Sequence, residues 1–251
     1  MGPAKRGVSL MAAVNQIADL HVIGAFEVLV AGVPVALPAG PRRLLAYLAV
    51  NGGAQRRDAV TGQLWGWVPQ AQARARLRTA LWRIGQLPAG LVRSGRDELQ
   101  LRPSVRVDLA ESAGLARGLL DPSGRDRLPD SADLLTDDIL PGWDEDWLQL
   151  ERERHRQLRI HALEALSRRL TAAGRFGAAI DVAYRAIAAE PLRESAWCAL
   201  IRAHLAEGNR SVASHQLGEY RRLLADELGV DPSETIEALL SPPAGLRRSG
   251  P

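Results

Sequence analysis

HALEALSRRLTAAGRFGAAI (161–180) and SAWCALIRAHLAEGNRSVAS (195–214) are two related stretches that begin 34 residues apart, and they indicate the architecture of the second half of the chain. Small residues stand where neighbouring helices would cross, and a glycine stands at the turn. Each stretch is therefore predicted to form a pair of helices. The identical pairs of positions are Ala162 and Ala196, Ala165 and Ala199, Leu166 and Leu200, Gly174 and Gly208, and Ala179 and Ala213.

A period of 34 residues is typical of tetratricopeptide repeats. One such helix pair cannot bury its apolar face alone, so neighbouring pairs must stack. WDEDWLQLERERHRQL, from about residue 144 to 158, is predicted to be a long helix that covers one end of the stack. Trp143 and Trp147 are expected to anchor this helix on the repeat pair. RRLLADELGVDP (221–232) is predicted to close the other end, with Gly229 and Pro232 as stop signals.

In the first half, RARLRTALWRI (74–84) has the pattern of an amphipathic helix. At roughly 100° per residue, Leu77, Leu81 and Ile84 fall in one narrow stripe. Arg76, Thr79 and Arg83 lie on the far side, so the helix can bury one edge and expose a cationic edge. The alternative is a solvated amphipathic helix without a ligand. Trp82 is exposed by the same wheel, yet packing against the following hairpin is expected for it.

The segments around this helix give the order strands, three helices, hairpin, which is the layout of a winged helix-turn-helix. A second helix of about 15 residues has the length needed to lie in a B-DNA major groove. The expected fold class is therefore mostly α, with an N-terminal winged helix-turn-helix (α+β) followed by the all-α repeat domain. The predicted segments are strands in 20–37 with a turn near Ala31-Gly32, a helix from Pro41 to Asn51-Gly52-Gly53, helices at 56–65 and 71–86, and a hairpin at 91–101 turning at Ser94-Gly95.

Charge is distributed unevenly along the chain. Residues 1–107 contain 14 Lys or Arg and 5 Asp or Glu, whereas residues 108–251 contain 18 and 24. A basic half joined to an acidic half suggests that one part meets a polyanion and the other meets a different partner. The arginine count alone is weak evidence, because Lys5 is the only lysine and such a bias reflects a GC-rich genome.

Composition also restricts the class of protein. With 46% hydrophobic and 24% charged residues in 251, the chain can bury one large core or two ordinary ones. Since no apolar run of about 18 residues occurs, no membrane span and a cytoplasmic location are expected. The single cysteine, Cys198, excludes an intrachain disulfide and is expected to pack in a core. The five histidines form no His-Glu-x-x-His pattern, so we expect no metal, no cofactor and no enzyme activity.

Several segments together resemble SARP-type transcriptional activators, which join an OmpR-type winged helix to a bacterial transcriptional activation domain. The resemblance covers roughly residues 19–240. The wing lacks the tyrosine usual in the family, and Arg56 stands where the family has a capping Ser or Thr. The matching segments are ILPGWDEDWLQLERERHRQLRIHALEAL (139–166), AAEPLRESAWCALIRAHLAEGNR (188–210), YRRLLADELGVDPS (220–233), PRRLLAYLAVNGG (41–53), QLWG (63–66), ARLRTALWRI (75–84) and VRVDL (105–109).

This resemblance implies a domain plan. It places a disordered lead at 1–18, the winged helix at 19–107, the activation domain at 108–245 and a tail at 246–251. Residues 121–133 are the expected flexible link. With Lys5 as its only lysine, the chain cannot form a Gly-x-x-x-x-Gly-Lys phosphate loop, so it resembles the small members without an ATPase.

The resemblance also implies a function as a sequence-specific activator on double-stranded DNA, bound at direct repeats. The helix 71–86 would enter the major groove, the wing 91–101 would lie on the backbone, and the helical half would engage RNA polymerase or a second copy in a homodimer. Simple solvation is the alternative for each single arginine. The base-reading candidates are Arg76, Thr79 and Arg83, and the backbone candidates are Arg42, Arg43, Arg74, Arg78, Arg93 and Arg96.

A second hypothesis remains open at this point. The chain could be a repeat-domain adaptor whose basic half binds another polyanion or an acidic protein. Salt dependence separates the two hypotheses, because phosphate contacts release counterions and give a steep slope.

Overall fold

The structure is a computed structural model, and it describes residues 18–121, 128–129 and 131–241. These residues form two compact units. One unit contains the chain up to Ser112 together with Asp137–His155, and the other contains Ala113–Thr136 and everything from Arg156 onward. The expected tail, most of the expected lead and most of the expected flexible link lie outside the described residues. Ala18 corrects the lead, because it is buried in a strand and pairs with Val30.

The first unit begins with a four-stranded sheet in the order β3-β2-β1-β7. The predicted turn at Ala31-Gly32 is confirmed, and both residues have positive φ, 52° and 78°. The last strand was not predicted: residues 105–107 pair in parallel with β1. The strands are β1 (Ala18–His21), β2 (Glu27–Val30), β3 (Val33–Pro34) and β7 (Val105–Val107).

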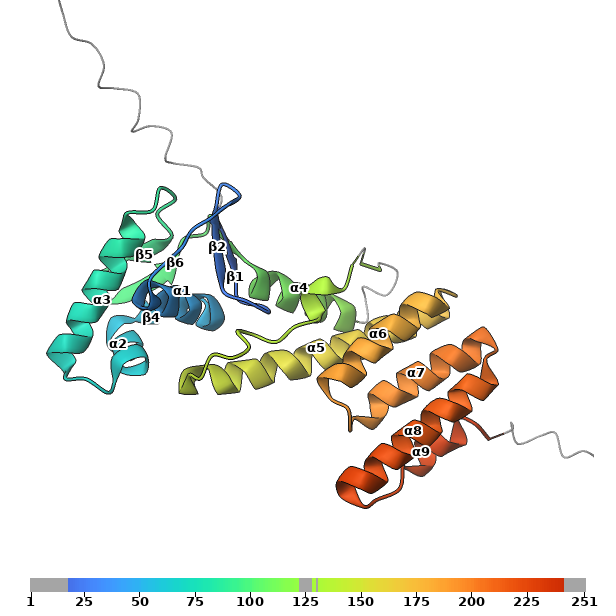
Figure 1. Cartoon of the computed structure of the whole chain (residues 1–251). Helices are drawn as coiled ribbons and strands as arrows, with labels where there is room; N and C mark the ends of the chain where they lie inside the picture. Colours follow the sequence, from blue (N-terminus) through green and yellow to red (C-terminus); the bar gives the residue numbers. More distant parts are fainter. Residues whose placement is uncertain (1–17, 122–127, 130, 242–251) are drawn as a thin grey trace, which may run out of the picture. The chain divides into compact units, whose positions relative to one another are not determined.

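Three helices and a hairpin follow the first three strands, in the order that the sequence predicts (Figure 1). The hairpin turns at Arg96-Asp97 and not at Ser94-Gly95, because Ser94 still pairs with Leu99 and the Gly95 N–H donates to the Glu98 carbonyl at 2.9 Å. A third short strand joins the hairpin in the order β4-β6-β5. These elements are α1 (Ala39–Asn51), β4 (Gln55–Arg56), α2 (Arg57–Trp65), α3 (Gln70–Gly85), β5 (Val92–Ser94) and β6 (Glu98–Leu101).

The segment Asp137–His155 belongs to the winged-helix unit and not to the repeats. The Leu140 N–H donates to the Val22 carbonyl at 2.8 Å, which attaches this segment to the end of β1. Trp143 lies 5.7 Å from Phe26 between ring centroids, and Trp147 meets Tyr47 edge-on at 5.2 Å. The expectation that both tryptophans anchor a helix on the repeats is therefore wrong.

The second unit consists of stacked helices, and the predicted repeat is confirmed. Gly174 and Gly208 both have left-handed φ, 72° and 93°, and Gly229 ends α8 at 67°. The alanines and leucines paired between the two repeats are all buried. Helix α5 continues to Ala172, beyond the predicted end near 158, because no Gly or Pro interrupts it. The elements are α4 (Asp108–Leu120), η3 (Asp133–Leu135), α5 (Asp146–Ala172), α6 (Phe176–Ala189), α7 (Glu194–Glu207), α8 (Arg210–Leu228) and α9 (Glu234–Ala238); α4 and α5 each contribute residues to both units.

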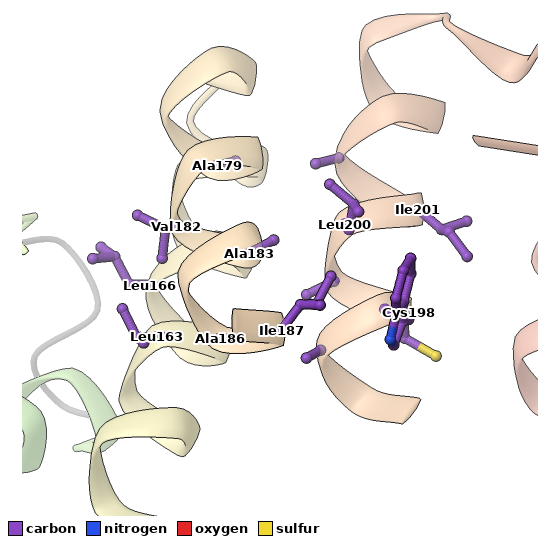
Figure 2. Packing of buried hydrophobic residues seen from close by; sticks show 14 of the residues in the cluster. Leu163, Leu166, Ala179, Val182, Ala183, Ala186, Ile187, Cys198, Leu200 and Ile201 are labelled. Carbon is purple, nitrogen blue, oxygen red and sulfur yellow. The ribbon is translucent and has the colours of Figure 1, made fainter. Parts of the chain in front are cut away.

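Small residues allow the repeat helices to approach closely (Figure 2). Leu163 and Leu166 of α5 are buried in one cluster with Ala183 and Ala186 of α6. The Ser167 hydroxyl donates to the Ala179 carbonyl at 2.9 Å and so joins α5 to α6. Burial of these alanines costs little side-chain entropy, and their small size lets the helices pack closely.

Cys198 packs in this cluster at 7% exposure, as predicted. Burial raises the pKa of its thiol, which keeps the reactive thiolate scarce at neutral pH. No described helix is long and apolar enough to cross a bilayer.

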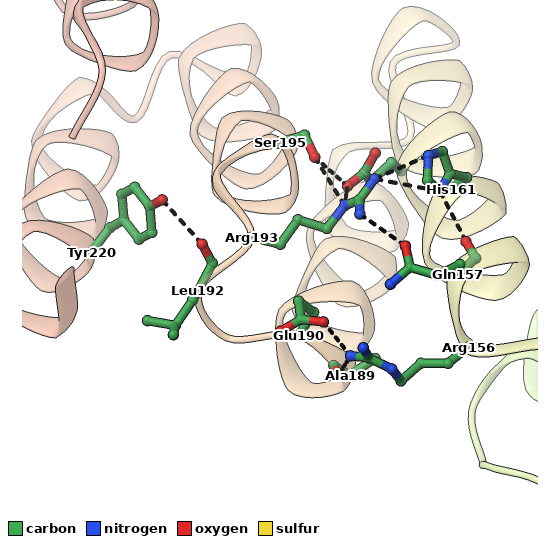
Figure 3. A network of polar contacts seen from close by, with 10 residues as sticks. Arg156, Gln157, His161, Ala189, Glu190, Leu192, Arg193, Ser195 and Tyr220 are labelled. Carbon is green, nitrogen blue, oxygen red and sulfur yellow. Dashed lines mark hydrogen bonds and ion pairs between the residues drawn. The ribbon is translucent and has the colours of Figure 1, made fainter. Parts of the chain in front are cut away.

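A polar network fastens the α6–α7 loop to α5 (Figure 3). Arg193 donates through Nε to Glu164 Oε1 at 2.6 Å, and the Ser195 hydroxyl donates to the same oxygen at 2.6 Å. Arg156 of α5 pairs with Glu190, which follows the C-terminal end of α6 in the same loop. The Tyr220 hydroxyl donates to the Leu192 carbonyl at 3.3 Å, and burial raises the pKa of Tyr220 to about 12. The loop is thus held from both sides.

Two glycines of the repeat unit differ in conformation and predict opposite effects of alanine. Gly208 has φ 93°, so Gly208→Ala forces a Cβ into a left-handed backbone and is expected to lower the free energy of unfolding by about 1 kcal/mol. Gly218 lies inside α8 with open space where a Cβ would stand, so Gly218→Ala is expected to raise it by about 0.5–1 kcal/mol. Urea denaturation followed by circular dichroism measures both, and equal effects of the two variants contradict the assignment.

Candidate nucleic-acid interface

Helix α3 buries one narrow face against the rest of its unit. Leu77 and Ile84 are 3% and 1% exposed, as predicted, and Ala73 and Ala80 are buried beside them. Leu81 is only partly buried, because the stripe follows the spacing 73, 77, 80 and 84. The alanines allow α3 to pack closely on α1 and α2, while the residues of the opposite face stay exposed.

The opposite face carries the predicted base-reading residues. Arg76, Thr79 and Arg83 are all exposed, together with Gln72 and Gln86. These five residues are called the α3 ridge. The Thr79 hydroxyl donates to the Ala75 carbonyl at 3.1 Å, so its methyl group and oxygen lone pairs are what it can offer to a partner. The ridge therefore presents two guanidinium groups and two amides to solvent.

A hollow of about 340 Å³ adjoins α3 between the start of α2 and the turn of the wing. It is named the basic hollow, since five arginines line it against two aspartates. Arg74 forms an ion pair with Asp58 at 3.5 Å, and the other predicted backbone residues here, Arg78 and Arg96, are exposed. The lining residues are Arg56, Arg57, Asp58, Thr61, Arg74, Leu77, Arg78, Arg96 and Asp97.

Arg57 connects the wing to α2 and shapes this hollow. It donates through Nη2 to the Ser94 hydroxyl at 2.5 Å and through Nε to the Gly95 carbonyl at 3.0 Å. Its backbone N–H donates to the Asp97 carbonyl at 2.9 Å. The wing turn thereby satisfies one of the free N–H groups at the start of α2, where Arg56 makes no side-chain cap.

Sequence reasoning missed both Arg56 and Arg57 as candidates. Arg56 was weighed only as a poor cap, although the Arg-Arg pair at a helix start was a visible signal. The remaining wing residue, Arg93, is exposed on β5 as predicted.

The two arginines before α1 differ from each other. Arg42 is exposed, with its guanidinium 5.3 Å from the Phe26 ring and 5.6 Å from the Trp143 ring. Arg43 instead forms a bidentate ion pair with Glu145, in which Nε lies 2.5 Å from Oε1 and Nη2 lies 2.7 Å from Oε2. Its guanidinium also stacks on Trp67, 4.7 Å from the centre of the ring. Its charge is already compensated inside the protein, so Arg43 is a structural residue and the expectation of a backbone clamp is not supported for it.

The electrostatic division of the chain also needs correction. Residues 18–112 and 137–155 contain 14 basic and 14 acidic residues, because seven of the acidic ones lie in 137–155. Residues 113–136 and 156–251 contain 16 and 15. Neither structural unit is strongly charged as a whole. Positive charge is instead local, since eight of the 14 basic residues lie on the start of α2, on α3 and on the wing.

The Arg43–Glu145 ion pair is expected to stabilise the winged-helix unit. The two side chains are 18% and 16% exposed, so the pair is intermediate between a surface ion pair and a buried one. A double-mutant cycle with Arg43→Ala and Glu145→Ala should therefore give a coupling energy of about 1–2 kcal/mol. The Arg106–Asp19 pair, 62% and 21% exposed, serves as control and should give about 0.5 kcal/mol. Equal coupling in the two cycles, measured by urea denaturation, would show that Arg43 is free for other partners.

Comparisons with known proteins agree with this architecture. The bacterial transcriptional activator domain family matches residues 105–241. The regulatory protein AfsR of Streptomyces coelicolor is 33% identical over 212 residues, which cover 79% of this chain and 21% of AfsR. EmbR of Mycobacterium tuberculosis, solved in complex with a low affinity phosphopeptide, shares the fold with a TM-score of 0.71. That similarity has 22% identity and covers 90% of this chain and 64% of EmbR.

The chain thus spans about a fifth of AfsR and under two thirds of EmbR. The match to the activator domain nevertheless extends over more than half of the chain, and it includes the whole described repeat stack. On that match this chain belongs to the bacterial transcriptional activator domain family, and its similarity to AfsR agrees with the resemblance to SARP-type regulators.

Proposed function

We propose that the chain binds double-stranded DNA sequence-specifically, with α3 in the major groove. The observation that carries this proposal is the α3 ridge, an uncovered cationic face on a helix whose other face is buried. A helix of 16 residues is about 24 Å long, and the major groove of B-DNA admits one α-helix. A winged helix places this helix in that groove.

Each exposed residue then has a role. Arg76 and Arg83 reach base edges, where a guanidinium can bind guanine O6 and N7 together, and Thr79 offers its methyl group to thymine. The other arginines contact phosphate and fix the register of the complex. The proposed backbone contacts are Arg42, Arg56, Arg74, Arg78, Arg93 and Arg96.

The repeat unit is proposed to engage protein, either RNA polymerase or a second copy bound beside the first. Stacked helix pairs form extended surfaces suited to protein segments, and the family consists of activators. The sequence analysis expected an acidic half, but basic and acidic residues nearly balance in the repeat unit. Net charge therefore does not support this part of the proposal. A protein that binds genomic DNA in a bacterium would be located in the cytoplasm.

Selection of bound duplexes from a random pool, followed by footprinting of the full chain, tests this proposal. We expect enrichment of two half-sites in the same orientation, spaced by about one helical turn or a multiple of it. A single enriched half-site would exclude the direct repeat, and a pool without enrichment would favour the adaptor hypothesis.

Two arginine variants should separate base reading from backbone contact. Arg83→Ala is expected to weaken specific binding by about 1–3 kcal/mol and to relax one base position, because one bidentate contact is lost. Arg93→Ala should weaken binding to all duplexes alike and reduce the salt slope by about one unit. Gel shifts at several salt concentrations measure both effects.

Arg202→Ala is the matched control, since it removes an exposed arginine from the repeat unit. It should leave affinity and slope unchanged. If Arg83→Ala and Arg93→Ala behave like this control on a selected duplex, α3 and the wing are not the interface. A shallow slope without discrimination in the unmodified chain would again favour the adaptor.

A further inference from the structure

Trp82 is a large aromatic residue that the fold leaves in solvent. It lies on α3 beside the ridge, next to Arg83 in the sequence, and it is 62% exposed. The expected packing against the hairpin is therefore wrong. Burial of an aromatic side chain is favourable, so a tryptophan left exposed beside the α3 ridge needs an explanation.

The position of Trp82 around α3 defines what it can reach. At about 100° per residue, Trp82 lies about 40° from Arg78 and about 60° from Thr79. It therefore stands between the base-reading ridge and the flank that faces phosphate. The guanidinium of Arg83 lies 5.8 Å from the centre of its ring, which adds a cation to the same aromatic surface.

We propose that Trp82 packs its ring against a deoxyribose of the strand that forms one wall of the major groove. This inference rests on the proposed function of α3. A sugar is the apolar component of the DNA backbone, and it lies between the bases and the phosphates, as Trp82 lies between Thr79 and Arg78. Because the contact is apolar, it contributes affinity without releasing a counterion.

Three variants of the full chain test the proposal on a duplex selected by the unmodified protein. Trp82→Ala should weaken binding about tenfold, with an unchanged salt slope and an equal loss on duplexes altered at single positions. Trp82→Phe should retain binding within about twofold, since a smaller ring still covers the sugar. Trp67→Ala is the matched control, because Trp67 is 63% exposed and lies before α3; it should leave affinity unchanged.

Tryptophan fluorescence gives a second readout. The change in emission on adding duplex should disappear in Trp82→Phe and persist in Trp67→Phe, because only Trp82 becomes covered. Thermal unfolding of Trp82→Ala should match the unmodified chain, since an exposed side chain contributes little to the core.

Each other outcome overturns the inference in a recognisable way. Unchanged affinity of Trp82→Ala, with discrimination intact in the unmodified chain, refutes the Trp82 contact and leaves the proposed function standing. A salt slope reduced by about one unit would mean that Trp82 acts through the charge of Arg83. A loss that vanishes when one thymine is replaced by deoxyuridine would assign a methyl contact in place of the sugar. If the unmodified chain binds no duplex, the proposed function itself fails.

Discussion

The structure depends on one constraint, which is that α3 must bury one face and keep the other bare. Leu77 and Ile84 supply the large buried side chains, and Ala73 and Ala80 keep the distance to α1 and α2 short. A stripe this narrow leaves room on a 16-residue helix for a continuous polar ridge. A broader apolar face would strengthen the core, but it would also replace the residues that can meet a ligand.

The basic hollow depends on a second arrangement, the attachment of the wing to α2. Five arginines close together repel one another, and the structure offsets this in two ways. Asp58 pairs with Arg74, and Arg57 donates to the wing turn at Ser94 and Gly95. The remaining arginines stay in solvent, where water and salt screen their charges from one another. The hydrogen bonds of Arg57 thus position the wing relative to α3.

Local signals predicted most of the fold and most of the exposed residues of the candidate interface. The repeat followed from residues such as Gly174 and Gly208, whose backbone conformations are set by their own turns. The Arg43–Glu145 pair joins residues 102 positions apart, and no periodic pattern reports such a contact. The same limit hid the parallel pairing of β1 with β7 and the stacking of Trp143 on Phe26. A helical wheel predicted correctly that Trp82 points away from the core. It could not show that the hairpin leaves this side chain uncovered.

The contacts of 137–155 change the electrostatic argument for the winged-helix unit. Since this segment brings seven acidic residues into a unit with 14 basic ones, the unit has no excess charge to attract DNA from every side. Asp144, Glu145 and Asp146 line a separate hollow beside Trp67, which shares no residue with the basic hollow. A balanced unit with separated charges is oriented by the field of a duplex, and its acidic part is repelled from phosphate. If the chain binds DNA as proposed, this orientation before contact favours approach through α3 and the wing over non-specific adhesion by the whole unit.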